Sequence, residues 1–509
     1  MPNGENMRVK KAKKNVLYGI ITYVFLMILT FVNRKIFINV LGQNMAGLQG
    51  VLLNILSFLN LVESGVGMAI MFSLYKPFAE DNKVQIKSIL TLYSRIYKFC
   101  GVVILILGIV LSNYLGIFVK GQLDLDYVKI CFLLYIIDTI ITYFFSYKTC
   151  LLYASQNGYI ISLWDFNFKA VRYVVQILVL FVYKSFFVFI LIQLITNILY
   201  LITINYIINK KFPWVSEVKA TNIEGKDNII RNIKALFMHK IGGFVVFSTD
   251  NLLISYFLDL KTAGLYVNYS MILSFCSNFT NKIFDGINAS IGNLLAEKNS
   301  EKSYEVFKKI FFFNFWLASF ICIALYNTID SFIALWLGEE FVLNNTVVVV
   351  LLLNLYISIM RVAVDRFKES GGLYYADRYV PLFEVIINLV FSIVLVKKVG
   401  LAGVFIGTLI SNLSVVFWVK PKIVFNQVFN KSLLEYFSNY LKYLAFGVIA
   451  FLVTRTMYYF INFSNGISGF LLNCIVNVIL INTTYLIIFH NSEEFLYYKN
   501  MILKKLGRG

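Results

Sequence analysis

Four long stretches of the chain contain no charged side chain, and each is about 20 residues or more in length. At a rise of 1.5 Å per residue, a helix of that length crosses a hydrocarbon core of about 30 Å. Lipid offers no hydrogen bonds to a backbone, so such stretches must be helical to satisfy their own amide groups. The stretches are Cys100–Val119, Ser185–Asn209, Ile310–Ile329 and Val399–Val419.

The composition also indicates that most of the chain lies in lipid and not in water. The 509 residues are 59% hydrophobic and only 14% charged, whereas a soluble protein carries about 25% charged residues. The alternating segments of a membrane β-barrel do not occur in this sequence. The six cysteines show no Cys-x-x-Cys spacing and there are only two histidines, so we expect neither a metal site nor a cofactor. The sequence therefore predicts an all-α polytopic membrane protein.

Apolar windows predict about 14 transmembrane helices. Most of the 46 lysines and arginines fall in alternate connections, on the side of the amino terminus, and the positive-inside rule then places both termini in the cytoplasm. Because the net charge of +19 is spread over these connections, we do not expect nucleic-acid binding. The expected helices are 15–33, 46–72, 99–119, 130–147, 158–182, 185–209, 236–258, 264–291, 310–329, 345–364, 379–396, 400–419, 443–461 and 467–489.

The sequence contains an internal repeat at an offset of 217 residues. Ala46-Gly47-Leu48 aligns with Ala263-Gly264-Leu265, and Asn82 aligns with Asn299. Both copies run in the same direction through the predicted topology, so the repeat is parallel, with its axis along the membrane normal. We therefore expect two six-helix lobes and a carboxy-terminal helix pair. The predicted parts are an N-lobe at 1–209, a cytoplasmic linker at 210–235, a C-lobe at 236–430 and a final helix pair with its tail at 431–509.

Several predicted helices contain basic residues, which are costly in a membrane and therefore face a cavity or the bundle interior. The candidate substrate-cavity cations are Lys169, Arg172, Lys282 and Arg361. A purely structural interpretation is open for most of them, because an acid lies three or four residues away on the same helix face. These acids are Asp165, Asp285 and Asp365. For Arg172 we favour a role in the cavity, since Lys169 is nearer to Asp165.

Three further acids, Glu63, Asp138 and Asp250, lie within predicted helices. The sequence has no Gly-x-x-x-x-Gly-Lys-Ser/Thr motif and no long soluble segment, so transport would be driven by an ion gradient, a membrane potential or a concentration difference. An acid in a low-dielectric site has a raised proton affinity, which makes each of the three a candidate for coupling to H+ or Na+. Alternatively, these acids pair with Lys240 or other cations and only hold the bundle together.

The stretches Asn33–Asn82 and His239–Tyr269 resemble the Wzx-type polysaccharide flippases of the multidrug/oligosaccharidyl-lipid/polysaccharide exporter superfamily. The resemblance implies two six-helix lobes around a hydrophilic cavity. It implies a substrate of oligosaccharide repeat units on undecaprenyl pyrophosphate, moved from the inner to the outer leaflet of a bacterial plasma membrane for capsule, O-antigen or exopolysaccharide biosynthesis. Membrane lipids, a polysaccharide polymerase and a chain-length regulator would be its partners.

Other functions stay open at this point. A multidrug cation antiporter of the same superfamily would favour acids and aromatic rings in its cavity. The extra helix pair also resembles the fourteen-helix branches that include peptidoglycan lipid flippases. An enzyme, such as a polymerase or glycosyltransferase, would need a larger domain outside the membrane than the segment 210–235 provides. We therefore expect a transporter and not an enzyme.

Overall fold

The computed structural model is helical throughout, and no strand occurs in the part of the chain that it describes. Eleven helices are long and apolar enough to cross a membrane within that part. The predicted all-α polytopic membrane fold is therefore confirmed. The structure describes residues 2–63, 66–120, 122–155, 157–221, 227, 229–230, 233, 249–285, 287–373, 376–461 and 466–505.

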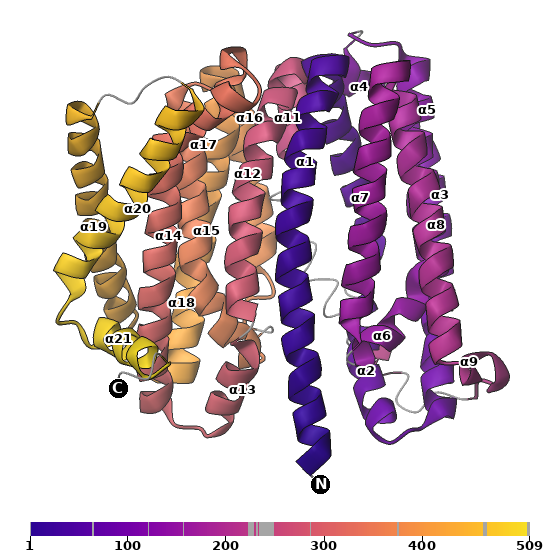
Figure 1. The fold of residues 1–509 in the computed structure, drawn as a ribbon, viewed down its shortest axis with the longest axis horizontal. Helices are drawn as coiled ribbons and strands as arrows, with labels where there is room; N and C mark the ends of the chain where they lie inside the picture. Colours follow the sequence, from indigo (N-terminus) through magenta and orange to yellow (C-terminus); the bar gives the residue numbers. More distant parts are fainter. Residues whose placement is uncertain are drawn as a thin grey trace. The chain divides into compact units, whose positions relative to one another are not determined.

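The chain forms two compact units, Met1–Val267 and Asn268–Gly509, and the boundary between them falls within helix α12. The first unit contains α1 (Pro2–Leu59), η1 (Asn60–Glu63), α2 (Val66–Ala79), α3 (Lys83–Ser112), α4 (Gly116–Val119), α5 (Leu125–Ser146), η2 (Tyr147–Thr149), α6 (Cys150–Ala154), α7 (Gly158–Tyr183), α8 (Phe186–Lys211), α9 (Trp214–Glu217), α11 (Asp250–Phe257) and the start of α12 (Leu260–Asp285) (Figure 1).

The second unit continues α12 and adds α13 (Asn288–Ala296), α14 (Ser300–Trp336), η3 (Glu339–Phe341), α15 (Asn345–Ser370), α16 (Val380–Val399), α17 (Leu401–Ser411), the π-helical turn η4 (Asn412–Val416), α18 (Phe417–Val424), the π-helical turn η5 (Phe425–Phe429), α19 (Leu433–Phe460), α20 (Ile467–Phe489) and α21 (Glu493–Lys505) (Figure 1). The lobe and linker boundaries expected from the sequence stay predictions, and most of the linker 210–235 beyond residue 221 lies outside the described residues.

Among the described residues, the structure has 11 candidate spans where the sequence predicts about 14 helices. The difference arises at three places in the chain. The first two predicted helices are joined into one span, Thr22–Glu63, which is broken at Gly42, where φ is 84° and ψ is 173°. Such dihedral angles are open essentially to glycine alone. Residues 236–248 of the seventh predicted helix lie outside the described part. The eighth corresponds to α12, which is not among the 11 spans.

The backbone repeats at the offset of 217 residues. Asp81 and Lys298 both have the left-handed conformation, with φ values of 50° and 55°. The next residue in each copy is an asparagine that caps a helix: Asn82 Oδ1 accepts from the amide of Gln85 at 3.0 Å, and Asn299 Oδ1 accepts from that of Lys302 at 3.0 Å. Each asparagine favours the start of a helix at this place, because its side chain satisfies an otherwise unpaired amide.

Two glycines that are equivalent in the repeat contact each other inside the first unit. A Cβ on Gly47 would lie 1.9 Å from Leu260 O, and one on Gly264 would lie 2.4 Å from Gln43 O. Leu260 is itself the repeat equivalent of Gln43, so the contact is reciprocal. Gly50 likewise lies against its own equivalent, Val267, at 2.6 Å from an added Cβ. Residues contact their own equivalents in this way when two parallel helices are related by a two-fold axis.

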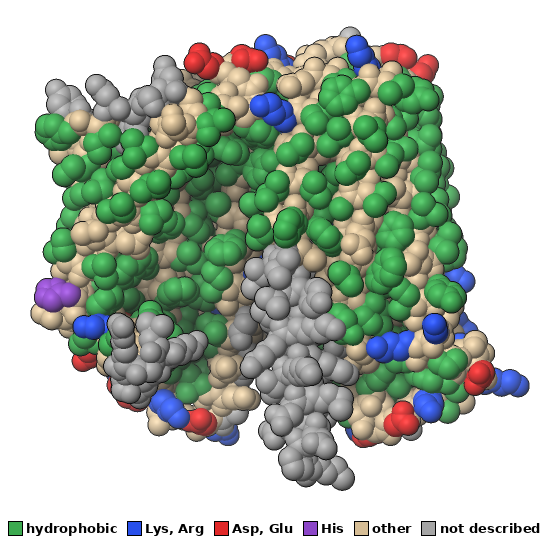
Figure 2. Space-filling model, in the orientation of Figure 1, with side chains coloured by type: hydrophobic (Ala, Val, Ile, Leu, Met, Phe, Trp, Pro, Cys, Tyr) green, Lys and Arg blue, Asp and Glu red, His purple; other side chains and the backbone are tan. Residues whose placement is uncertain are grey.

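Apolar side chains cover the middle of the helices, and charged side chains lie mainly at the helix ends (Figure 2). The lipid-facing surface includes large exposed side chains such as Phe181, which is 61% exposed, and Ile487, which is 69% exposed. In water such a surface would be unfavourable by roughly 25 cal/mol per Å² of apolar area. The surface is therefore that of a protein immersed in a bilayer.

Aromatic rings fill the core of the second unit. Phe307 and Phe311 of α14 lie with their ring centroids 5.4 Å apart. Phe307 also contacts Phe429 of η5 at 5.0 Å, and Phe311 contacts Tyr436 of α19 at 5.4 Å. The carboxy-terminal helices thus pack onto α14 through large rings, which bury much apolar area per residue.

Candidate substrate site

Helix α7 places three charged residues on one face. Lys169 Nζ lies 2.8 Å from Asp165 Oδ2, four residues earlier, and both side chains are partly exposed. Arg172 has no ion pair among the described residues, and its Nε is buried without a hydrogen-bond partner there. Its guanidinium lies 5.1 Å from the ring of Tyr173. Arg172 thus keeps donors available for a ligand, at a place where an unpaired charge is costly.

A small cavity of about 40 Å³ lies between this face and α8. Its volume is enough for one or a few water molecules. With Lys169 and Arg172 against Asp165, its lining has a net charge of +1, which favours an anion. The lining residues are Asp165, Phe168, Lys169, Arg172, Thr196, Asn197 and Tyr200.

A second arginine, Arg34, lies in the same unit. Arg34 directly follows the first predicted helix, 15–33, but it is only 7% exposed and belongs to α1. Its Nη1 donates to Gln49 Oε1 at 3.0 Å.

The three acids considered for ion coupling all accept hydrogen bonds from neutral donors. Asp138 accepts from Gln193 Nε2 at 3.0 Å and from Asn197 Nδ2 at 2.6 Å. Since Asn197 also lines the cavity beside Arg172, Asp138 is connected to that cavity through one amide.

The other two acids are bonded to tyrosines. Glu63 Oε1 accepts from Tyr97 Oη at 2.6 Å, and Asp250 Oδ2 accepts from Tyr266 Oη at 3.1 Å. Asp250 is 6% exposed, and its Oδ1 has no hydrogen-bond partner among the described residues. Lys240, a cation that would pair with these acids under the alternative interpretation, lies outside the described residues.

In the second unit, Arg361 belongs to a compensated network. Its Nε lies 3.2 Å from Asp365 Oδ2, and its Nη1 donates to Asn412 of the π-helical turn η4 at 2.8 Å. Lys420 of α18 binds the other oxygen of Asp365 at 2.8 Å. One carboxylate therefore holds two cations from different helices.

The remaining predicted residues, Lys282 and Asp285, are both exposed on α12. Asp285 Oδ1 lies 2.9 Å from Arg366 Nη1 of α15. The same guanidinium binds Asn281 at 2.9 Å and Glu369 at 3.2 Å. Arg366 therefore links α12 to α15.

The buried or bonded charges that sequence reasoning missed include Arg34, Lys420 and Glu384. Lys420 was placed one residue beyond a predicted helix that in fact continues through α18 and η5. Glu384 is 7% exposed within α16. A charged residue inside or directly beside an apolar window was the available signal for each of them.

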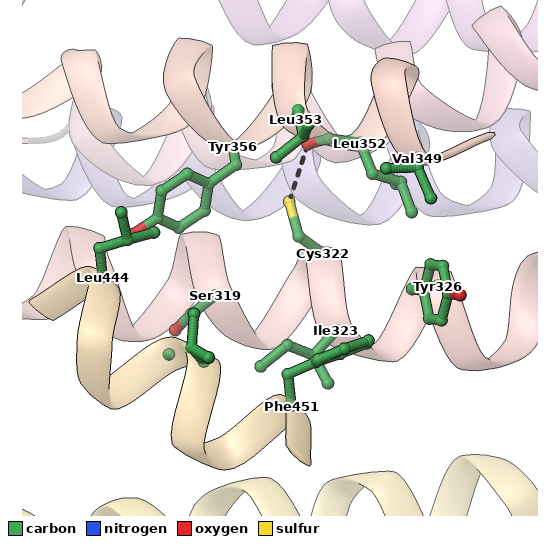
Figure 3. Close-up of a pocket in the computed structure, with 12 residues that line it drawn as sticks. Ser319, Cys322, Ile323, Tyr326, Val349, Leu352, Leu353, Tyr356, Leu444 and Phe451 are labelled. Atoms are coloured by element: carbon green, nitrogen blue, oxygen red, sulfur yellow. Dashed lines mark hydrogen bonds between the residues drawn. The ribbon is translucent and has the colours of Figure 1, made fainter. Parts of the chain in front are cut away.

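An apolar pocket of about 410 Å³ lies between α14, α15 and α19 (Figure 3). Ile323, Leu353 and Phe451 are among its apolar walls, while Cys322 Sγ lies 3.6 Å from Leu352 O. Ser319, Tyr326 and Tyr356 add polar atoms to an otherwise hydrocarbon lining. Such a lining suits an apolar chain and not a charged group.

Comparison with known proteins gives structural matches only. No protein-family model matches the chain, and no curated protein matches it in sequence. A structure of the lipid II flippase MurJ in an inward closed conformation has a TM-score of 0.65 at 15% identity, covering 93% of this chain and 99% of that one.

Two other solved structures are similar. A mutant of the Vibrio cholerae MATE transporter VcmN has a TM-score of 0.57 at 14% identity, over 85% of this chain and 100% of that one. A MOP superfamily transporter from Pyrococcus furiosus has a TM-score of 0.53 at 12% identity, over 80% of this chain and 92% of that one. The chain has the fold of MOP superfamily transporters. All three neighbours are transporters or flippases, and at these identities they establish the fold alone.

Proposed function

We propose that this protein is a flippase that moves undecaprenyl-pyrophosphate-linked oligosaccharides from the inner to the outer leaflet of a bacterial plasma membrane. The products would serve capsule, O-antigen or exopolysaccharide biosynthesis, as in the Wzx-type flippases. The observation that supports this most is Arg172, whose guanidinium lies beside Lys169 at a cavity and has an Nε without a protein partner among the described residues. A pyrophosphate needs cations in the membrane, and the fork of an arginine fits phosphate oxygens.

The apolar pocket between α14, α15 and α19 supports a lipid-linked substrate in particular. A polyprenyl chain gains free energy by leaving water and contacting hydrocarbon surfaces. The pocket, lined by Ile323, Leu353 and Phe451, would hold part of such a chain. Both termini would lie in the cytoplasm, with alternating access as the transport mechanism.

The direct test is binding and transport in liposomes that contain the purified protein and a fluorescent undecaprenyl-pyrophosphate oligosaccharide. Loss of charged hydrogen bonds worth about 1.5–3 kcal/mol predicts roughly 10- to 100-fold weaker binding for Arg172→Ala. Arg172→Lys should recover part of the binding affinity, because lysine keeps the positive charge but lacks the planar guanidinium group that binds two oxygens at once. Lys35→Ala, which removes an exposed cation of α1 that lines neither pocket, is the control. Unchanged binding and transport in Arg172→Ala would remove Arg172 from the site.

A multidrug cation antiporter is the second candidate, and the acids of the first unit support it. Asp138 is held by two amide groups near the cavity, which leaves its charge able to attract a cation. An antiporter would extrude a fluorescent organic cation and would lose this activity in Asp138→Asn. Cation transport without movement of the lipid-linked sugar would favour this candidate over the flippase.

Coupling to H+ or Na+ through Glu63, Asp138 or Asp250 belongs to the same proposal. Each of these acids accepts a hydrogen bond from a neutral side chain, and an acid in a low-dielectric site has a raised proton affinity. Transport in liposomes should then depend on a proton or sodium gradient. Transport that is indifferent to both gradients and to membrane potential would contradict coupling.

A further inference from the structure

A basic pocket separate from the α7 cavity lies at one end of the first unit, where α3, η2, α8 and α9 meet. Its volume is about 480 Å³. We call it the α3 pocket. Its lining residues are Lys87, Leu90, Thr91, Ser94, Arg95, Lys98, Tyr147, Lys148, Asn209, Val215 and Ser216. In the part of the chain that the structure describes, four cations and no carboxylate line it.

The cations of α3 share one helix face. Lys87, Arg95 and Lys98 are spaced by eight and three residues, which at 100° per residue places them within about a quarter-turn of one another. Arg95 and Lys98 are exposed, whereas Lys87 is half-buried. The fourth cation, Lys148, comes from η2 and is also half-buried. Two lysines thus form the floor and two cations form the rim.

Both floor lysines are fixed by neutral acceptors. Lys87 Nζ donates to the backbone oxygen of Val215 in α9, and Lys148 Nζ donates to Asn209 Oδ1 at 2.9 Å. An ammonium group has three N–H donors, so each lysine keeps donors for a ligand. Neither has an ion pair with a described carboxylate. Their positive charges therefore repel each other without local compensation, and a bound anion would remove that cost.

The pocket is also structurally built. The segment that follows α8 returns along α3, where the amide of Thr221 donates to Ser88 Oγ at 2.8 Å. Phe212 packs on Phe78 with ring centroids 6.3 Å apart, and Figure 1 shows α9 beside the end of α8. The walls are therefore held by contacts outside the four cations. The topology predicted from the sequence places this end of α3 on the cytoplasmic side.

We propose that the α3 pocket binds a phosphate group. Phosphate oxygens accept the charge-assisted hydrogen bonds that lysine and arginine offer, and Ser94 adds a hydroxyl group on the same face. Leu90 and Val215 give the lining an apolar part, and basic pockets between the cytoplasmic ends of membrane helices bind lipid headgroups. The phosphate therefore comes from an anionic lipid headgroup or from a soluble phosphate compound.

The test measures binding to the full-length protein in detergent, with dioctanoyl phosphatidic acid and inorganic pyrophosphate as separate probes. The double variant Lys87→Gln/Lys148→Gln should bind the effective probe at least about tenfold more weakly, the loss of two charged hydrogen bonds. Lys83→Gln is the matched control, because Lys83 lies one turn earlier on α3, is exposed and does not line the pocket. Lys87→Arg/Lys148→Arg should retain binding, which separates loss of charge from misfolding.

Binding of the lipid probe that pyrophosphate cannot displace would assign the site to a bilayer headgroup. Displacement by pyrophosphate at similar concentrations would assign it to a soluble phosphate. Absence of binding by both probes would overturn the proposal, and so would equal binding by the double variant and Lys83→Gln. The outcome is independent of Arg172 and of sugar-lipid transport.

Discussion

The same helix face is basic and open in the first repeat but aromatic and filled in the second. At the offset of 217 residues, the α3 residues Lys87, Leu90, Ser94, Arg95 and Lys98 correspond to Tyr304, Phe307, Phe311, Phe312 and Phe315 of α14. The first set lines the α3 pocket. The second set packs against η5, α19 and α20 through rings such as Phe429, Tyr436 and Phe489.

The two repeats also differ in how their basic residues are paired with carboxylates. In the second repeat, Arg361 and Lys420 share Asp365, and Arg366 binds Asp285. In the first repeat, Arg172 and the cations of the α3 pocket have no carboxylate partner among the described residues. The two repeats therefore differ. In the second, Arg361, Lys420 and Arg366 join helices through carboxylates. In the first, Lys169 is paired with Asp165, while Arg172 and the cations of the α3 pocket keep donors for anions.

Exchanging equivalent residues between the faces of α3 and α14 should change the free energy of unfolding the most. Phe311 is 2% exposed, so Phe311→Ser should lower the free energy of unfolding by about 3–5 kcal/mol through cavity formation. The reverse exchange, Ser94→Phe, enters an open pocket and should change stability by less than about 0.5 kcal/mol. Thermal unfolding in detergent measures both.

Ser94→Phe should also weaken phosphate binding to the α3 pocket, because the ring occupies the space of the ligand. Similar losses of stability for the two exchanges would mean that the two faces are equally packed. That result would contradict the contrast between an open α3 face and a filled α14 face.

Removing the shared carboxylate should give the next largest effect. Asp365→Ala leaves Arg361 and Lys420 near each other without this counter-charge, and we expect a loss of about 3 kcal/mol. The comparable change in the first repeat, Asp165→Ala, breaks a partly exposed pair and should cost less than about 1 kcal/mol. The double variant Asp365→Ala/Lys420→Met should be more stable than Asp365→Ala alone. If it is not, Lys420 does not depend on Asp365 for compensation.

A third prediction concerns a place where the two repeats are alike. Gly47→Ala and Gly264→Ala each add a methyl group against backbone atoms, so each should cost about 1–3 kcal/mol. Because the contact is reciprocal, the two losses should be similar. Gly292→Ala is the control, since nothing lies within 4 Å of an added Cβ, and alanine favours the helix by about 1 kcal/mol. Strongly unequal losses would contradict the two-fold relation.

The smallest expected effect is at the helix caps. Asn82→Ala and Asn299→Ala each remove one bond to a backbone amide, and each should lower stability by about 1 kcal/mol. Asn82→Asp and Asn299→Asp keep a hydrogen-bond acceptor at the cap and should retain most of the stability that the asparagine provides. Thermal unfolding of the four variants measures these differences. A loss in only one repeat would show that the equivalent caps differ in importance.

Much of the fold could be predicted because lipid restricts what an uncharged stretch can become. The stretch Ser185–Asn209, for example, falls almost entirely within α8 (Phe186–Lys211). The sequence predicted only a connection between two helices near Gly42. Glycine permits many backbone conformations, so its presence does not indicate which one it adopts. The repeat was visible because equivalent backbone positions, such as Asn82 and Asn299, kept the same side chain.

The site was less predictable because helix spacing reports only contacts within one helix. The spacing of Asp165 and Lys169 places them together, and the structure has them 2.8 Å apart. The partner of Asp285 is Arg366 of another helix, which no spacing indicates. Arg34 and Lys35 are neighbours in the sequence, yet Arg34 is buried and Lys35 is exposed. A hydropathy window averages over both and cannot separate them.

The contact between Gly47 and Gly264 has a consequence for the history of the chain. A reciprocal contact between equivalent residues is the kind of interface that two identical subunits make in a symmetric dimer. In a half-length ancestor, a single glycine codon would have supplied both sides of that contact, so any change there would have been felt twice. In a chain that contains both halves, each side of the contact is encoded separately and could change alone. In this chain both positions are glycine, whereas the equivalent faces of α3 and α14 carry different side chains.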